Sequence, residues 1–282
     1  MGGGGRHKQY GIVFFMLPPS LLGFFDMPIP EIQLQTENRI LTIKINRPEK
    51  KNALTRDMYL GLTEALNLLD SDDGIHVGLI TGTPDCFTAG NDLEDFLKYP
   101  PTSEGSPVAD FIERLITLKK PIIAAVNGPA IGIGTTLLLH CDFVYATNKT
   151  KFQLPFVNLG LCPEAASSAI LPNIASHQKA SELLMLGEVF LAEDALKMGI
   201  VNQIFNTDDY LENTLEIAGK LAEKPTDALY TTKALLKRNR GIDTLAITQQ
   251  EFKEFCRLLV SPTAKEIMQA FIEKRKPDIH RA

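Results

Sequence analysis

The chain has 282 residues, of which 44% are hydrophobic and 22% are charged, as in an average globular protein. This composition excludes a disordered chain, a collagen-like fibre and a coiled coil. A formal charge of -5 argues against a protein that binds nucleic acid non-specifically. Tryptophan is absent and aromatic residues make up only 7%, which leaves few rings to stack against bases. The composition favours a soluble, acidic enzyme.

Residues 1–26 are expected to form an N-terminal extension, disordered or non-native, ahead of a domain that begins near Met27. Basic residues near the start precede an apolar run over 12–25, which Pro18 and Pro19 interrupt. This outline is similar to a secretory signal, but no cleavage site of small residues follows the run. The run is also shorter than the roughly 20 residues that span a bilayer. A weak contact with a membrane surface is the alternative, and no membrane span is expected later in the chain.

Strands and helices alternate in the first half of the chain. Alternating apolar residues over 32–45 predict an antiparallel hairpin that turns at Glu37 and Asn38. Apolar residues three or four apart over 55–69 predict a helix with one buried face. The other elements expected here are a strand over 77–81, a helix over 108–118, a buried strand over 122–126, an apolar helix that ends near 139, and strands over 143–146 and 151–153.

Helices dominate the second half. The elements expected here are helices over 165–174, 177–186 and 192–198, a strand over 201–205, and nearly continuous helix over 210–274. Repeated mixing of strands and helices predicts an α/β fold. We therefore expect an α/β core over 27–206 and a helical C-terminal region over 207–282.

The cysteines predict free thiols. They stand at positions 86, 141, 162 and 256 without C-x-x-C spacing, which is typical of a reducing cytoplasm. His140 beside Cys141 has no second ligand pair, so no metal site is expected. The final tripeptide is not a peroxisomal address, and the expected location is cytoplasmic.

Two glycine-rich segments are the main candidates for chemistry. The serine-hydrolase motif G-x-S-x-G and the phosphate-loop motif G-x-x-x-x-G-K-[ST] are both absent. Instead, segments 86–93 (CFTAGNDL) and 126–134 (VNGPAIGIG) each place glycines after a predicted strand. Such turns can present unpaired backbone N–H groups, and two converging N–H groups form an oxyanion hole. The alternative is that these glycines only allow tight turns.

These two segments, together with 46–55 (NRPEKKNALT), resemble the crotonase (enoyl-CoA hydratase/isomerase) superfamily. The resemblance runs from about residue 31 to 275 and includes 195–201 (ALKMGIV) in the family's order. It implies a crotonase-like spiral of ββα units with a C-terminal helical trimerisation region, and a homotrimer or hexamer. It also implies an acyl-CoA thioester substrate in fatty-acid β-oxidation, with no cofactor, since coenzyme A is part of the substrate.

The resemblance assigns roles to single residues. The oxyanion donors would be the backbone N–H groups of Asn91 and Ile133, which act whatever their side chains. The residues that would border coenzyme A are Lys50, Lys51, Asn52, Ala53 and Leu54. The residues that would line the thioester pocket are Ala89, Gly90, Asp92, Leu93, Gly132 and Phe156. Asp92 and its neighbours Glu94 and Asp95 have a second interpretation, as caps of the helix that follows.

The two glutamates that hydratases of this superfamily use to add water are both missing. The corresponding positions hold Thr136 and Phe156. Because water activation in those enzymes needs a matched pair of carboxylates, the sequence argues against a hydratase.

Glu164 is the remaining candidate acid/base. Segment 152–164 (FQLPFVNLGLCPE) resembles peroxisomal-type Δ3,Δ2-enoyl-CoA isomerases, in which the glutamate after the proline is the single acid/base. Judged without the resemblance, Pro163 and Glu164 are a favourable helix start. Apolar neighbours such as Phe156 and Leu161 are expected to raise the pKa of Glu164 toward neutrality. The predicted activity moves the double bond of a 3-enoyl-CoA to give a trans-2-enoyl-CoA.

Two alternatives stay open. One is an enoyl-CoA hydratase with an unrecognised carboxylate pair, and the other is a non-catalytic acyl-CoA-binding protein. The basic clusters over 233–240 and 274–276 are expected to be solvated faces, with contacts to the phosphates of coenzyme A as their second interpretation.

Overall fold

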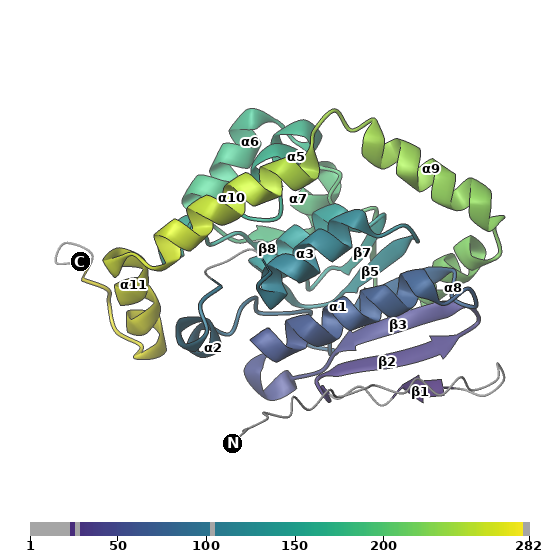
Figure 1. Cartoon of the computed structure of the whole chain (residues 1–282), viewed down its shortest axis with the longest axis horizontal. Helices are drawn as coiled ribbons and strands as arrows, with labels where there is room; N and C mark the ends of the chain where they lie inside the picture. Colours follow the sequence, from purple (N-terminus) through teal and green to yellow (C-terminus); the bar gives the residue numbers. More distant parts are fainter. Residues whose placement is uncertain (1–22, 26–28, 102–104, 279–282) are drawn as a thin grey trace, which may run out of the picture.

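A seven-stranded sheet forms the base of the fold, which a computed structural model describes for residues 23–25, 29–101 and 105–278 (Figure 1). Its strand order is β1-β2-β3-β4-β5-β7-β10, antiparallel from β1 to β3 and parallel from β3 onward. The strands are β1 (Gly23–Phe25), β2 (Ile32–Glu37), β3 (Ile40–Ile45), β4 (Val77–Thr81), β5 (Ile122–Val126), β7 (Phe143–Thr147) and β10 (Gln203–Phe205). A second sheet has the order β6-β8-β9, made of β6 (Pro129–Ile131), β8 (Lys151–Gln153) and β9 (Phe190–Leu191).

The predicted hairpin over 32–45 is confirmed, but its turn lies one residue later than expected, because Glu37 still pairs with Ile40. β2 and β3 pair along their full length, and Asn38 and Arg39 turn the chain with φ angles of 50° and 64°. Two-residue hairpins favour such positive φ values. β1 lies within the segment expected to precede the domain, yet it pairs with β2. The rest of that predicted extension, residues 1–22 and 26, lies outside the described residues.

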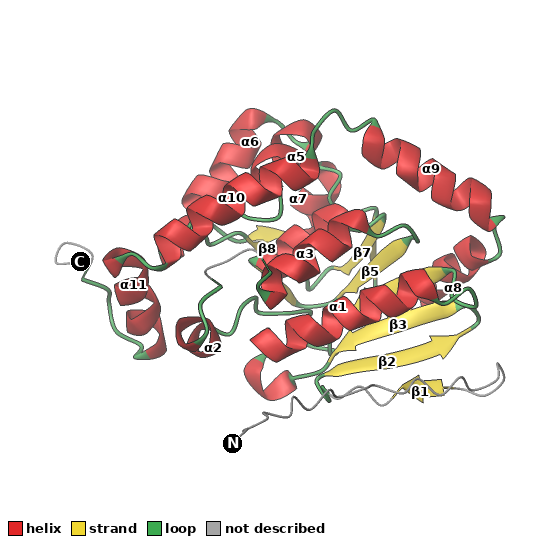
Figure 2. Cartoon of the chain, viewed as in Figure 1, coloured by secondary structure: helices red, strands yellow, loops and turns green. Residues whose placement is uncertain are grey.

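Helices cover both faces of the main sheet (Figures 1 and 2). α1 (Arg56–Ser71) and α3 (Pro107–Thr117) bury their apolar sides on one face, and α8 (Tyr210–Ala222) covers the other. Because side chains alternate along a strand, β5 contributes Ile122 to the first core and Ile123 to the second. The buried run predicted as a strand therefore joins two hydrophobic layers.

The helices predicted in the second half are present. They are α5 (Ser167–Ile174), α6 (His177–Ser181), α7 (Ala192–Lys197), α9 (Thr226–Arg238), α10 (Thr244–Leu259) and α11 (Pro262–Ile272). Two short helices, α2 (Leu93–Lys98) and α4 (Ile133–Thr136), follow the two glycine-rich segments. α10 contacts α3, and α11 contacts α2, so the C-terminal helices return to the first half of the chain (Figure 1).

Lys233 of α9 is buried and Lys237 is partly buried, so the expectation of a solvated basic face is wrong for these two lysines. Lys233 is 5% exposed, and its ammonium lies 2.6 Å from Asp142 Oδ2 and 2.7 Å from the carbonyl of Lys120. Lys237 donates to the carbonyls of Ile116 and Leu118 at the end of α3, at 2.8 and 3.2 Å. Burial lowers the pKa of Lys237 to about 8. These side chains fasten α9 to the core.

Replacement of Lys233 tests this attachment. Lys233→Met removes the charged partner of Asp142 and leaves the buried carbonyl of Lys120 without its donor, so we expect the free energy of unfolding to fall by about 2 kcal/mol. Arg238→Met is the matched control, because Arg238 is exposed on the same helix. Urea denaturation of both variants measures the difference, and equal stabilities would contradict the attachment.

Candidate active site

The two glycine-rich segments lie against each other. The Ile131 N–H donates to the carbonyl of Thr88 at 3.0 Å, so the first segment pairs with β6. Gly90 has a φ of +88°, and a Cβ at this position would lie 2.8 Å from the Ile131 carbonyl oxygen. Only glycine fits such a left-handed, close approach. The glycine therefore sets the distance between the two segments.

The two N–H groups predicted as oxyanion donors sit in these segments. Gly132, with a φ of +56°, ends β6 and precedes Ile133, the first residue of α4. The first N–H groups of a helix have no partner within the helix. Within the part of the chain that the structure describes, neither the Ile133 N–H nor the Asn91 N–H has a hydrogen-bond acceptor. Both donors are therefore available to a ligand.

A cavity of about 830 Å³ opens beside these two donors. Most of the residues predicted to bind substrate line it: Lys50, Lys51, Ala53, Ala89, Gly90, Asn91, Asp92, Leu93, Gly132, Ile133 and Phe156. Helix α11 and the residues after it close another side with Phe271, Lys274 and Arg275. Together with Lys50 and Lys51, Lys274 and Arg275 give the cavity four cations, which suits a phosphorylated ligand.

Asn52 and Leu54 do not line this cavity, in contrast to the prediction. The Asn52 amide is fully buried and donates to Thr83 Oγ1 at 3.0 Å and to the Cys86 carbonyl at 2.7 Å. Its backbone N–H and carbonyl are also bonded, to Arg47 and Thr88. Asn52 thus holds the first glycine-rich segment in place instead of contacting a ligand.

Asp92 lines the cavity, but its carboxylate is already bound. It accepts from the backbone N–H groups of Glu94 and Asp95 at the start of α2, and Arg47 Nη1 lies 2.7 Å away. Burial alone would raise the pKa of Asp92, but the bonds from Arg47 and Asp95 lower it overall. The interpretation of Asp92 as a helix cap is confirmed.

The Glu164 carboxyl group is buried and bonded to helix α4, whose first residue, Ile133, lines the cavity. It is 7% exposed, does not itself line the cavity, and accepts a hydrogen bond from the Thr136 hydroxyl. Thr136 is the last residue of α4, whose first residue is Ile133. Burial raises the pKa of Glu164 to about 8, the Thr136 bond opposes the rise, and the charge of Glu251 adds to it. This is the pKa of a group that can both take and return a proton near neutral pH.

Tyr59 is a site residue that the sequence did not reveal. It is 2% exposed, and its hydroxyl donates to Asn91 Oδ1. Burial raises the pKa of Tyr59, and the charges of Glu164 and Asp95 raise it further. Tyr59 lies on the apolar side of the helix predicted over 55–69. Its place in the pattern is that of an ordinary core residue, so the pattern does not indicate a role in the site.

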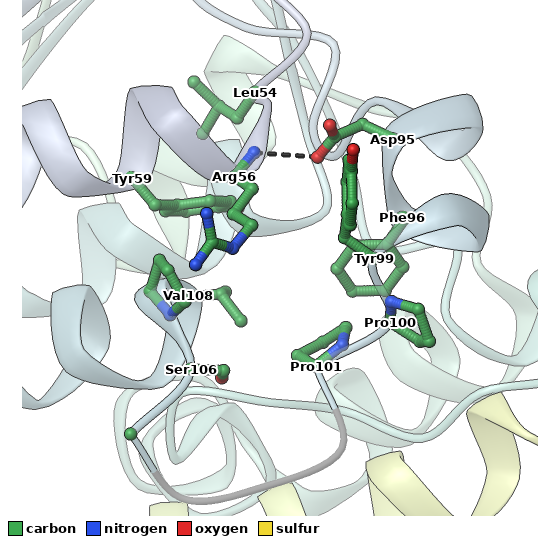
Figure 3. A pocket seen from close by; sticks show the side chains of 12 residues that line it. Leu54, Arg56, Tyr59, Asp95, Phe96, Tyr99, Pro100, Pro101, Ser106 and Val108 are labelled. Atoms are coloured by element: carbon green, nitrogen blue, oxygen red, sulfur yellow. Dashed lines mark hydrogen bonds between the residues drawn. The ribbon is translucent and has the colours of Figure 1, made fainter. Parts of the chain in front are cut away.

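A second pocket of about 320 Å³ adjoins the first, and Figure 3 shows its lining. Phe96 lines both pockets. Tyr59 lines the second pocket, and its hydroxyl donates a hydrogen bond to Asn91, which lines the first. Leu54 belongs to this second pocket. The Arg56 side chain reaches into it, and the Arg56 N–H donates to Asp95 Oδ2 at 2.8 Å (Figure 3).

No group of three or more His, Cys, Asp or Glu side chains in the described ranges could hold a metal ion. All four cysteines are free thiols, as predicted. His140, considered above as part of a metal corner, instead has its Nε2 2.7 Å from the carbonyl of Ala165.

The sequence profile described as enoyl-CoA hydratase/isomerase matches residues 35–281. This chain belongs to that family. Human enoyl-CoA delta isomerase 2 is 34% identical over 223 residues, 77% of this chain but 56% of the human protein's length. The 2,3-dehydroadipyl-CoA hydratase of Escherichia coli K12 is 32% identical over 249 residues, which cover 88% of this chain and 98% of that protein.

The fold prediction is confirmed by solved structures of the family. An enoyl-CoA hydratase/isomerase from Pseudoalteromonas atlantica T6c superposes with a TM-score of 0.82 at 39% identity, over 88% of this chain and 98% of that one. Isomerase and hydratase relatives are about equally similar to this chain, so membership of the family leaves the reaction to be argued from the site. None of the helices in the described part of the chain has the length and apolar character to cross a membrane. The oligomeric state and the cytoplasmic location stay predictions.

The raised pKa of Glu164 makes folding stability depend on pH. The folded state holds this proton up to about pH 8, whereas the unfolded chain releases it near the ordinary carboxyl value of 4.5. The stabilisation that protonated Glu164 contributes to the folded state is therefore complete below pH 4.5 and is lost as the pH rises through 8. Glu164→Gln removes this loss of stability at high pH, because the amide does not ionise, and it keeps an acceptor for the Thr136 hydroxyl. We therefore expect the variant to be more stable than wild type above pH 8, by on the order of a few kcal/mol.

Thermal unfolding between pH 4 and pH 9 measures this difference. The variant and wild type should be equally stable near pH 4 and should diverge as pH rises. Glu113→Gln, on the exposed side of α3, controls for loss of one surface carboxylate. A Glu164→Gln advantage that is the same at every pH would contradict the raised pKa.

Proposed function

We propose that this protein is a Δ3,Δ2-enoyl-CoA isomerase, which converts a 3-enoyl-CoA to a trans-2-enoyl-CoA. The observation that carries the proposal is the buried carboxyl group of Glu164, held by Thr136 with a pKa of about 8. Thr136 stands where a hydratase of the family would have its first glutamate. The hydroxyl thus supports one acid/base group instead of a pair.

The reaction needs only one such group. The Glu164 carboxylate takes a proton from C2, and the electron pair of the broken C–H bond moves onto the thioester oxygen to give a dienolate. The protonated Glu164 then returns a proton to C4. The double bond moves to C2–C3, the thioester carbonyl forms again, and the carboxylate is ready for the next turnover.

The unpaired N–H groups of Asn91 and Ile133 support the charged intermediate. Both are positioned by the fold before substrate arrives, and such donors stabilise a developing oxyanion by roughly 3 kcal/mol each. The buried apolar rings and chains around the cavity, such as Phe156 and Leu161, exclude water. Exclusion of water strengthens these hydrogen bonds and protects the dienolate.

The cations of the cavity support binding of coenzyme A. Lys50, Lys51 and Lys274 are near its rim, and phosphate groups are favourable partners for them. Arg275 is already paired, because its guanidinium donates to Glu266 at 2.5 and 2.9 Å. Lys50 also has a partner, since its Nζ lies 3.5 Å from Glu94 Oε2. Lys51 and Lys274 are therefore the side chains that we assign to the phosphates.

Conversion of trans-3-hexenoyl-CoA by the purified protein tests the proposal. The conjugated 2-enoyl thioester absorbs in the ultraviolet, and we expect its formation by wild type. Glu164→Gln should lower kcat by roughly 10²- to 10⁴-fold, because the amide cannot accept the C2 proton. Glu113→Gln serves again as the matched control and should retain activity.

The other outcomes identify the alternatives. Incorporation of oxygen from labelled water would indicate a hydratase. Binding of the acyl-CoA without conversion by any variant would indicate a binding protein. Equal activity of wild type and Glu164→Gln would indicate that another carboxylate is the acid/base.

The pH dependence of kcat/KM is a separate prediction. The first step requires the ionised carboxylate, so kcat/KM should rise with pH and level off above the Glu164 pKa of about 8. Initial rates with trans-3-hexenoyl-CoA between pH 6 and 9.5 measure the profile. A rate that is flat or falls across this range would contradict Glu164 as the base that starts the reaction.

A further inference from the structure

The backbone that carries Glu164 is held in an unfavourable conformation. Ala165 and Ala166, the next two residues, have φ angles of 54° and 56°. The left-handed region is unfavourable for a residue with a Cβ, and here two such residues are consecutive. Strain of this kind persists only where the surrounding structure enforces it, and it is frequent at functional sites.

Part of the enforcement comes from His140, the last residue of a short 3-10 helix (Leu137–His140) that follows α4. His140 is 5% exposed, and its Nε2 lies 2.7 Å from the carbonyl of Ala165. Burial lowers the pKa of His140 to about 4, so the ring is neutral at pH 7. Because a carbonyl only accepts, we assign the proton of the neutral ring to Nε2.

The other part comes from the C-terminal region. Glu251, in the middle of α10, is 8% exposed. Its Oε2 accepts from the Ala166 N–H at 2.6 Å, and its Oε1 accepts from the Ser168 N–H at 3.0 Å and from the Ser168 hydroxyl. Three donors of one turn thus converge on a carboxylate 83 to 85 residues further along the chain.

Glu251 replaces a cap that the sequence of α5 lacks. Ala166 occupies the N-cap position and has no side-chain oxygen to accept from the first N–H groups. A carboxylate at this end of a helix also interacts favourably with the helix dipole. Burial raises the pKa of Glu251, although the bonds from Ser168 and Ala166 oppose the rise.

We propose that Glu251 is a positioning residue for Glu164, which it aims by holding the Ala165–Ala166 turn. Both oxygens of the Glu251 carboxylate are bonded to donors of the turn, so Glu251 acts through the turn and not on the substrate. The inference rests on the proposed isomerase function. It also makes α10 part of the catalytic structure, and α10 leads directly into α11, which lines the same cavity.

Glu251→Gln and Glu251→Asp separate the two effects of this carboxylate. The glutamine keeps the size but turns an NH₂ group toward one of the three donors, and it removes the charge that helps to raise the pKa of Glu164. We expect kcat to fall about 10²-fold, since misplacement of a catalytic group by 1 Å has effects of this size. KM should change little, and the pH midpoint of kcat/KM should move below that of wild type. The aspartate keeps the charge on a shorter side chain, so kcat should fall without the shift in midpoint.

Glu254→Gln is the matched control. Glu254 is on the same helix, but it is exposed and pairs with Arg257 at 2.7 Å. Its kcat, KM and pH midpoint should be those of wild type. If Glu251→Gln does not fold, Ser168→Ala removes only one of the three donors and should lower kcat in the same direction by a smaller factor.

Hydrogen exchange followed by mass spectrometry gives a readout that does not depend on activity. Peptides that cover residues 162–172 should exchange faster in Glu251→Gln than in Glu254→Gln. If wild type is inactive, the proposed isomerase function fails, and the exchange still decides whether Glu251 holds the turn. Kinetics and exchange in Glu251→Gln that equal those of Glu254→Gln would overturn the inference.

Discussion

The burial of one carboxyl group, that of Glu164, determines most of what is distinctive in this site. A charge in this position has little access to water, so the pKa rises to about 8, and a group that is an acid elsewhere becomes a base for neutral pH. The hydroxyl that bonds to it belongs to Thr136, at the position where the sequence comparison expects the first glutamate of a hydratase. The fold must therefore support a buried carboxyl group and a strained turn, which are both unfavourable by themselves.

Helix α4 joins the two halves of the proposed chemistry. Its first residue, Ile133, offers an unpaired N–H, and its last, Thr136, holds Glu164. The second donor, Asn91, is held by the close approach of Gly90 to β6 and by the Tyr59 hydroxyl. The four residues of α4 thus fix the position of the proposed oxyanion donor relative to the proposed acid/base. A change in α4 is therefore expected to affect both groups.

Local patterns in the sequence predict much of this molecule. Strict alternation predicted the hairpin over 32–45, and glycines after strands predicted the two segments that meet at the cavity. The residues that were missed act at long range. The Tyr59 hydroxyl bonds to a residue 32 positions further along the chain, and Glu251 bonds to a turn 85 positions before it. Lys233 is buried, although a charged helix face is usually solvated. The periodicity of apolar residues does not predict such contacts, because each contact depends on how the helices pack against the sheet.

The central claim is that one shielded carboxyl group carries a proton from C2 to C4. The most direct test uses a trans-3-enoyl-CoA with deuterium at C2, incubated with wild type in ordinary water and analysed by mass spectrometry of the 2-enoyl product. Deuterium at C4 of the product is the predicted result, since a buried Glu164 exchanges its proton slowly with solvent during a turnover. A product that carries no deuterium at C4 would contradict the account.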